Sequence, residues 1–376
     1  MILTLAIKNL FHDRIRLAVT LVGILFSVVL VAVQLGLYYG ARKMIVGMVD
    51  HANAELWVTP FGAKSFEEGG VLLNQRVRHS ALSVPGVESA VPIYVNFSEW
   101  RKPGGGSTTV IIVGANGEEN GLRPWGIVDG SEDAIAEPGG IAVDRSYLSD
   151  LGIEGLGDTA QIDQGRVRIN AITEGIRSFT MAPFVFTTLN RARSLQGFPS
   201  DNYSYLLIKL APGADQARVR TALAQRLSDR DVLTKAEFRD RSLQQWLFST
   251  GAGVALIGGA LLGLLVGTVI VAQTLYSSTK DHLTEFATLR ALGSSAGYIH
   301  RVILTQAAFS AILGYILGMA IALGITSLSE ATALPLLMTP GLAAGLFAIT
   351  IGMCAVSAIS AILKVTKIDP AMVFSR

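Results

Sequence analysis

The sequence predicts an α-helical membrane protein with four transmembrane helices and a large α+β domain inserted between spans one and two. Half of its 376 residues are hydrophobic, only 16% are charged and the mean hydropathy is +0.46, a composition that soluble domains seldom have. Four runs without Asp, Glu, Lys, Arg or His cover residues 17–40, 251–275, 302–328 and 341–363. Each run exceeds the roughly 20 residues that cross a bilayer.

Lysine and arginine predict the orientation of the four spans. Basic residues precede the first span, lie between the second and third and follow the fourth: Lys8, Arg14, Arg16; Lys280, Arg290, Arg301; Lys364, Lys367, Arg376. The loop at 329–339 has Glu330 and no Lys or Arg. By the positive-inside rule, the loop at 276–301, the tail at 364–376 and the amino terminus are cytoplasmic, and the domain at 42–246 lies outside.

Residues 1–16 place Leu3, Ile7, Leu10 and Phe11 on one side of a helix. This pattern predicts either an amphipathic helix on the inner membrane surface or an extension of the first span with anchoring charges. The first span, 17–41, is too long for the core of a secretion signal, and a poor cleavage site follows it. We therefore expect an uncleaved membrane anchor.

The domain at 42–246 has the alternating patterns of an α+β fold. Its expected strands cover 55–59, 93–101, 108–114, 140–144, 158–163, 166–173, 183–187 and 203–210, and its expected helices cover 145–151 and 214–227. A β-rich insertion at about 95–200 divides it into two lobes. The single cysteine, Cys354, lies in the fourth span, so the domain must be held together by its own apolar core.

Glycines recur at intervals of four in the later spans, 247–275, 302–328 and 340–363. They are Gly259, Gly263 and Gly267 in span two, Gly314 and Gly318 in span three, and Gly341 and Gly345 in span four. Small residues at this interval predict close approach of helices. The alternative is that glycine is simply frequent in membrane helices.

The loop at 276–301 holds a short charged helix between two apolar runs. Ser278 and Asp281 have the spacing of a capping box, and Gly293 followed by two serines is a stop signal. Leu283, Phe286, Ala287 and Arg290 fall at helical spacing between them. The helix is either a solvated membrane-surface helix or a coupling helix that docks into a soluble motor subunit.

The absence of several motifs argues against some classes of function for this chain. The sequence has no G-x-x-x-x-G-K-[ST], G-x-S-x-G, H-E-x-x-H or C-x-x-C, and its five histidines are scattered. A net charge of +2 without a clustered basic face gives no sign of a nucleic-acid partner. The spans lack the ionisable groups that ion-driven transporters use, so any energy for transport must come from another chain.

With this topology, the stretch from Glu285 to Gly293 resembles type VII ABC transporter permeases, the superfamily of MacB, LolC and FtsX-like proteins. The family pattern Glu-x-Ala-x-Leu-Arg-Ala-Leu-Gly is matched by Glu285, Ala287, Leu289, Arg290, Ala291, Leu292 and Gly293. The segments at 143–159 and 368–371 are also similar to that family. A closer similarity, to the DevC branch of glycolipid-type exporter permeases, rests on 55–58, 175–180, 183–188, 246–253 and 272–293.

The resemblance implies a non-catalytic permease subunit in the bacterial inner (plasma) membrane. Its implied partners are a separate ABC ATPase, which binds ATP and Mg, a second copy of the chain in a homodimer, a periplasmic adaptor, an outer-membrane channel and membrane lipids; this chain is expected to hold no cofactor or metal. The helix at 283–293 would be the coupling helix: Leu283, Phe286 and Leu289 would make apolar contacts with the ATPase, and Glu285 and Arg290 polar ones.

The export of a lipid, glycolipid or other amphiphile is the expected function, driven by motion that the spans transmit to the periplasmic domain. The alternatives are FtsX-like signalling, in which the same motion activates a periplasmic hydrolase without transport, and lipoprotein release or haem export.

Overall fold

The computed structural model describes residues 2–69, 72–117, 119–197, 201–291, 294–330 and 332–365. The chain forms two compact units. One is helical and comprises Met1–Tyr39, Val254–Glu330 and Pro335–Arg376; the other is an α/β unit that comprises Gly40–Gly253 and Ala331–Leu334.

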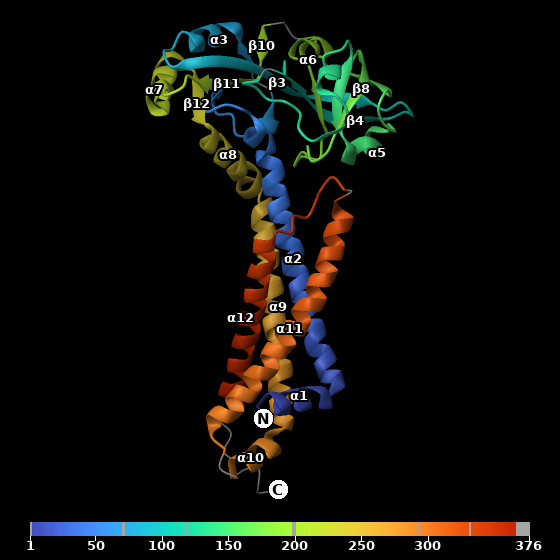
Figure 1. The fold of residues 1–376 in the computed structure, drawn as a ribbon, viewed down its shortest axis with the longest axis vertical. Coiled ribbons are helices and arrows are strands. Elements are labelled where there is room, and N and C mark those ends of the chain that lie inside the picture. Colours follow the sequence, from blue (N-terminus) through green and yellow to red (C-terminus); the bar gives the residue numbers. More distant parts are fainter. Residues whose placement is uncertain are drawn as a thin grey trace. The chain divides into compact units, whose positions relative to one another are not determined.

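The helical unit contains four helices that are long and apolar enough to cross a membrane (Figure 1). They are α2 (Arg14–His51), α9 (Ala252–Asp281), α11 (Ala296–Ser329) and α12 (Pro340–Val365), and the shorter helices are α1 (Ile2–His12) and α10 (Leu283–Ala291). The chain breaks between α1 and α2 at Asp13, so α1 is a separate helix rather than an extension of the first span. Phe11 of α1 packs edge-on against Phe309 of α11, with ring centroids 6.3 Å apart.

Glycines of α9 and α11 lie against α2. A methyl group added at any of the five glycines would lie 2.5–3.0 Å from an α2 side chain; they are Gly259, Gly263, Gly267, Gly314 and Gly318. At one of these contacts the hydroxyl of Ser27 donates a hydrogen bond to the carbonyl of Gly263 (2.9 Å). Helix α2 is therefore the helix on which α9 and α11 both pack closely.

The predicted close packing through Gly341 and Gly345 of α12 is wrong. No atom beyond their own helix lies within 4 Å of a methyl group placed at either residue. Helix α12 packs instead through larger side chains, including the buried Leu346 and Met353, and through the hydroxyl of Ser357, which donates to the carbonyl of Thr268 (2.9 Å). Spacing alone does not show which face of a helix meets a neighbour.

The α/β unit is built on one mixed sheet. The strands are β1 (Leu56–Pro60), β3 (Val87–Arg101), β4 (Ser107–Gly114), β5 (Ile127–Gly130), β6 (Gly140–Asp144), β7 (Thr159–Ile162), β8 (Gly165–Thr173), β9 (Phe184–Thr187), β11 (Tyr205–Leu210) and β12 (Arg230–Thr234). Their order is β12-β1-β11-β3-β4-β9-β6-β8-β5, and β7 pairs with β3 and β8. The β4–β9 and β6–β8 pairs are parallel and the others antiparallel.

Shorter elements complete this unit. The helices are α3 (Gln75–Leu82), α4 (Glu132–Ile135), α5 (Leu148–Leu151), α6 (Leu189–Leu195), α7 (Gln216–Arg226) and α8 (Lys235–Leu243). Strand β2 (Leu73–Asn74) pairs with β10 (Asn202–Tyr203). Single turns are formed by η1 (Phe66–Glu68) and η2 (Arg145–Tyr147), and η3 (Gln244–Ser249) is a stretch of π-helix before α9.

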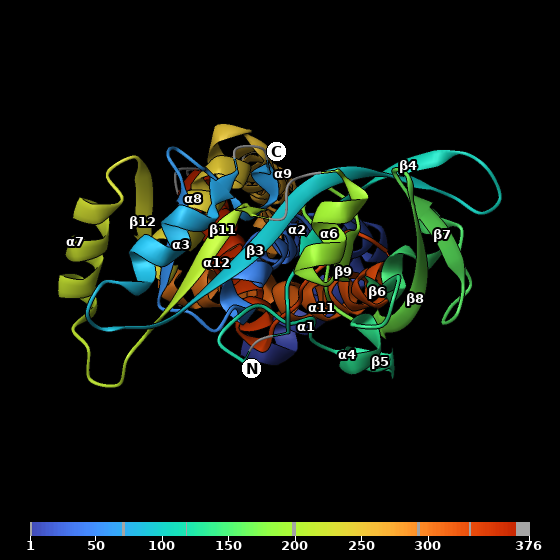
Figure 2. The same ribbon diagram turned by 90° about the horizontal axis from the view of Figure 1, so that it is seen from above.

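Strand β3 joins the two lobes of the unit. Its first half, residues 87–93, pairs with β11, and its second half, residues 94–101, pairs with β4. Figure 2 shows β3 running from the lobe with α3, β11 and β12 to the lobe with β4 and β7. The two lobes therefore share one continuous sheet and are not independent folds.

In the first lobe, which contains α3, β11 and β12, both faces of the sheet are covered. The burial pattern of β1 illustrates this. Leu56 and Val58 point to a core that includes residues of α3 and α7. Trp57 points to the opposite face, where its ring lies 5.1 Å from Phe238 of α8 and 6.1 Å from Tyr205. All of these side chains are buried, which explains why β1 is apolar at consecutive positions rather than at alternate ones.

A buried carboxylate fixes the loop that follows β8. Glu67 of η1 is 3% exposed and accepts hydrogen bonds from Ser178 Oγ (3.0 Å) and from the backbone N–H groups of Phe179 (3.2 Å) and Thr180 (3.3 Å). Burial raises the pKa of Glu67 above its ordinary value, although these hydrogen bonds oppose the shift. The ring of Phe179 lies 5.7 Å from that of Trp246 in η3, so the loop also contacts the segment that enters α9.

Several boundaries differ from those expected. Ser278 does not cap a helix: α9 continues to Asp281, because the carbonyl of Ser278 accepts the N–H of His282 (3.2 Å) and the turn is extended. The expected strand at 203–210 is interrupted at residue 204, between β10 and β11. Helices α4 and α6 and strand β5 were not predicted, since short elements give weak periodic signals.

Gly267 offers a test of the α2 contact. A methyl group there would lie 2.5 Å from Ser27 Cβ, so Gly267→Ala must push α9 away from α2, at a cost of about 1–3 kcal/mol. We expect a lower Tm in detergent for this variant. Gly258→Ala is the matched control, because a methyl group at this α9 position would have no neighbouring atom within 4 Å. It should leave Tm unchanged or raise it. Equal Tm values for the two variants would contradict the contact.

Glu67 predicts a pH dependence of stability. Because its native pKa is raised above 4.5, the folded state keeps this proton to a higher pH than the unfolded state. The stabilising contribution is full below pH 4.5 and is lost as the pH rises through the native pKa. Over that window we expect the Tm of the wild type to fall relative to that of Glu67→Gln, which does not titrate. Glu68→Gln, at an exposed neighbour, should follow the wild type; parallel curves for all three proteins would refute the prediction.

Candidate functional site

The segment between α9 and α11 forms a bent helical connection. Helix α9 ends at Asp281, one residue intervenes, and α10 begins at Leu283. The carbonyl of His282 accepts the N–H of Phe286 (3.0 Å), so the hydrogen bonding is almost continuous across the junction. The end of α9 and the start of α10 are therefore joined by backbone hydrogen bonds as well as by the chain itself.

One face of α10 is packed against its own chain. Phe286 is 5% exposed and Ala287 is 9% exposed. Phe286, with the partly buried Leu289, belongs to the apolar core of the helical unit, which also contains Leu275 of α9 and Ile303 of α11. These side chains hold α10 in place, so most of their surface is not available to a second protein.

The opposite face of α10 is exposed and polar. It presents Thr284, Glu285 and Thr288. The carboxylate of Glu285 is 60% exposed and lies 3.0 Å from His282 Nδ1, whose side chain is 12% exposed. This face offers hydrogen-bonding groups and a carboxylate to a partner, with little apolar area.

The structure brings some of the predicted coupling residues together. Glu285, Phe286 and Leu289 all lie on α10, Glu285 on the exposed face and the other two toward the core. Leu283 and Arg290 also lie in α10, and Gly293 is outside the described residues. Their role in ATPase contact stays a prediction.

An ion pair that the sequence did not reveal adjoins this segment. A guanidinium nitrogen of Arg16, in the first turn of α2, lies 2.5 Å from Asp281 Oδ2 at the end of α9. The two residues are 265 positions apart. The only sequence signal was that both flank apolar runs, because a charge at the end of one span gives no information about its partner at the end of another.

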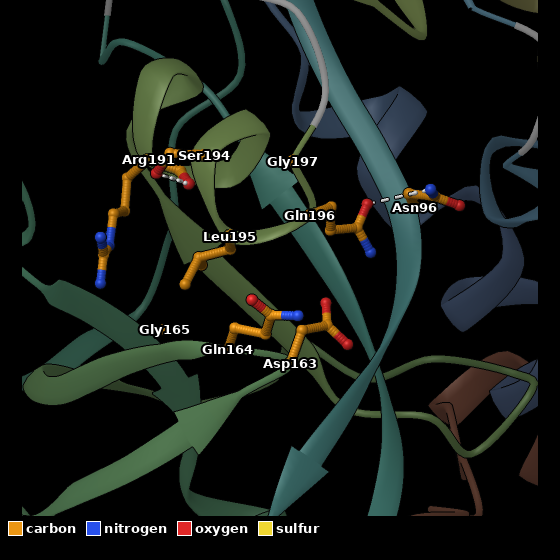
Figure 3. A pocket seen from close by; sticks show the side chains of 9 residues that line it. All are labelled: Asn96, Asp163, Gln164, Gly165, Arg191, Ser194, Leu195, Gln196 and Gly197. Atoms are coloured by element: carbon orange, nitrogen blue, oxygen red, sulfur yellow. Dashed lines mark hydrogen bonds between the residues drawn. The ribbon is translucent and has the colours of Figure 1, made fainter.

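A polar pocket lies in the second lobe of the α/β unit (Figure 3). It has a volume of about 610 Å3. It is lined by Asn96 of β3, by residues 163–165 at the β7–β8 turn, and by Arg191, Ser194, Leu195, Gln196 and Gly197 of α6 and its end. Sequence reasoning did not predict it, because its lining comes from three distant segments without a common motif.

The lining groups of this pocket bond to one another and to neighbouring residues of the same lobe. Asn96 Nδ2 donates to Gln196 Oε1 (2.9 Å), Gln196 Nε2 donates to the carbonyl of Phe97 (2.6 Å), and Asp163 Oδ1 accepts the N–H of Glu99 (3.2 Å). The pocket is therefore a hydrogen-bonded junction of β3, α6 and the β7–β8 turn. We assign no ligand to it.

Comparisons with known proteins agree on the family. A model of the MacB-like periplasmic core domain matches residues 17–226, and a model of the FtsX-like permease C-terminal region matches residues 257–370, which include α10. An uncharacterized ABC transporter permease of Mycobacterium tuberculosis is 25% identical over 363 residues, covering 96% of this chain and 95% of the relative. The macrolide export ATP-binding/permease protein MacB of Sodalis glossinidius is 22% identical, covering 88% of this chain and 53% of the relative.

Two solved structures also match part of the chain. The periplasmic region of MacB from Actinobacillus actinomycetemcomitans has a TM-score of 0.38 at 8% identity, covering 53% of this chain and 96% of that one. The extracellular domain of the transporter YknZ from Gram-positive bacteria has a TM-score of 0.35 at 15% identity, covering 48% of this chain and 98% of that one. The family assignment does not depend on these two likenesses.

The MacB-like model alone covers more than half of the chain, and the FtsX-like model covers most of the remainder, including the candidate coupling segment. This chain therefore belongs to the MacB-like and FtsX-like family of ABC transporter permeases.

Proposed function

We propose that this permease transmits the ATP-driven motion of a separate ATPase through the membrane to a periplasmic domain, and that α10 is its coupling helix. The observation that supports this proposal most directly is that α10 has a buried face, which includes Phe286, and an exposed polar face, which includes Glu285. A helix anchored on one side and free on the other is suited to receive a push from a partner and pass it to the helices behind it.

The packing of the helical unit supports transmission of force. Because α9 and α11 both approach α2 at glycines, the three helices are in close van der Waals contact along several turns. Closely packed helices move as a body rather than deforming separately. A displacement of α10 would thus reach α2 through packed backbone rather than through loose side chains.

We assign ATP hydrolysis to another chain, since this sequence contains no phosphate-binding loop of the G-x-x-x-x-G-K-[ST] type. ATP and Mg would bind to that ATPase chain.

The distribution of lysine and arginine supports an inner-membrane protein with both termini and α10 in the cytoplasm and the α/β unit in the periplasm. A homodimer with two ATPase subunits is the proposed assembly.

The proposed substrate class is a lipid, glycolipid or other amphiphile. Export as the general activity is supported by the MacB relative, which is named a macrolide export protein. The narrower assignment rests on the segments that resemble the DevC branch. One of these, residues 175–180, is the loop held by Glu67. A periplasmic adaptor and an outer-membrane channel would complete the export path.

Charge reversal at Glu285 tests the coupling helix. In the reconstituted complex with the partner ATPase, Glu285→Arg should lower both co-purification of the ATPase and permease-stimulated ATP hydrolysis by about tenfold, since a like or misplaced charge at an interface costs at least about 1.4 kcal/mol. Glu285 is preferable to Leu289 for this test, because Leu289 contributes to the core of the chain itself.

Glu330→Arg is the matched control. Glu330 is exposed and follows α11, a helix of 34 residues that places it about 50 Å from the α10 end. The Glu330→Arg variant should leave permease-stimulated ATP hydrolysis unchanged. If both variants behave like the wild type, α10 is a surface helix and the coupling role is refuted.

Transport and signalling are separated by a second measurement. Proteoliposomes with the full complex should release a labelled glycolipid to an added acceptor only with hydrolysable ATP, and Glu285→Arg should abolish the release. Signalling predicts instead that the permease captures a peptidoglycan hydrolase, captures no adaptor, and releases no amphiphile under conditions in which ATP is hydrolysed. That second result would overturn the export proposal while leaving the coupling role of α10 intact.

A further inference from the structure

We propose that Arg16 and Asp281 form a positioning pair that ties the coupling segment to α2, so that motion of α10 is delivered to the first membrane helix as well as to α9. This inference rests on the proposed coupling role of α10 and adds two residues that lie outside the Glu285–Gly293 motif. Neither residue need contact the ATPase.

Arg16 is held in place before it reaches Asp281. Asp13 accepts the backbone N–H of Arg16 through Oδ1 (3.2 Å), and its Oδ2 lies 3.3 Å from the guanidinium. The N–H of Leu17 is also bonded to the carbonyl of Asp13 (3.0 Å). Asp13 thus closes the first turn of α2 and orients the Arg16 side chain, which is only 23% exposed. An oriented guanidinium loses less conformational entropy on pairing than a free one.

Asp281 lies where a carboxylate alone is unfavourable. It is the last residue of the 30-residue helix α9, and a negative charge at a helix C-terminus opposes the helix dipole. The guanidinium of Arg16, 2.5 Å away, offsets this repulsion. The acid is therefore explained by its partner on α2 rather than by its own helix.

The pair sits at the junction through which α10 must act. Asp281 ends α9, and α10 starts two residues later. On the other side, Arg16 lies in the first turn of α2, the helix that the glycines of α9 and α11 contact farther along. Without the ion pair, α10 would be joined to α2 through the apolar core behind Phe286 and, by way of α9, through the glycine contacts farther along. With it, the junction and the start of α2 move together.

The test is a charge-exchange cycle in the reconstituted permease–ATPase complex. The variants are Arg16→Gln, Asp281→Asn, the two combined, and the exchange Arg16→Asp with Asp281→Arg. Arg14→Gln is the control: Arg14 lies in the same turn of α2, is exposed, and removes the same charge. Co-purification of the ATPase, the KM for ATP and the kcat of permease-stimulated hydrolysis are measured for each.

A positioning role predicts that each single variant lowers kcat by about two- to fivefold, with KM and co-purification unchanged. The double variant should be no worse than either single one, the exchange should recover at least half of the wild-type kcat, and Arg14→Gln should match the wild type. Wild-type kcat in both single variants would overturn the pair while leaving the coupling role of α10, tested by Glu285→Arg, intact. Loss of co-purification in the single variants, or no recovery in the exchange, would also overturn it by showing a merely structural role.

Discussion

The close packing of α9 and α11 on α2 is the constraint on which the helical unit depends. Lipid chains are as apolar as leucine side chains, so burial from water does not draw membrane helices together, and contact area and polar bonds must do so. Five glycines provide that contact, and Ser27 adds a hydrogen bond to the carbonyl of Gly263. Helix α2 occupies this position and also continues to His51, into the sequence of the α/β unit.

The α/β unit secures the end of α2 by a different interaction. Lys235, at the start of α8, donates hydrogen bonds to the carbonyls of Asp50 (2.8 Å) and Ala52 (2.9 Å). These are among the carbonyls that a helix end leaves without partners. Burial lowers the pKa of Lys235, although nearby Asp50 and Glu55 oppose the shift. A cation at this position also complements the helix dipole. Lys235 therefore caps the C-terminus of α2 and links it to α8.

Helix α10, the proposed coupling helix, combines a packed face with an exposed one. Its packed face includes Phe286 and Ala287, and its exposed face includes the carboxylate of Glu285. This arrangement explains why the motif mixes apolar and charged positions: the apolar ones fix the helix to its own chain, and the exposed ones remain for a partner. Phe286 thus has a structural role regardless of what binds outside.

The sequence by itself determined the class of this protein. Uncharged runs long enough to cross a bilayer predicted the four long apolar helices, and alternating or continuous apolar patterns marked most of the long strands. Spacing also identified the glycines of α9 and α11. It failed for Gly341 and Gly345, because a four-residue interval defines a face of a helix but not what lies opposite it.

Tertiary structure decided everything that depends on which distant residues meet. Only the fold shows that β3 belongs to two lobes, that Glu67 is bonded to residues 178–180, and that Arg16 reaches Asp281 across 265 positions. It also shows that Phe286 packs into the core of its own chain. Local patterns record the preferences of one segment for helix, strand or bilayer. Pairing between segments is set by packing and charge over the whole chain, and a single sequence carries no local record of it.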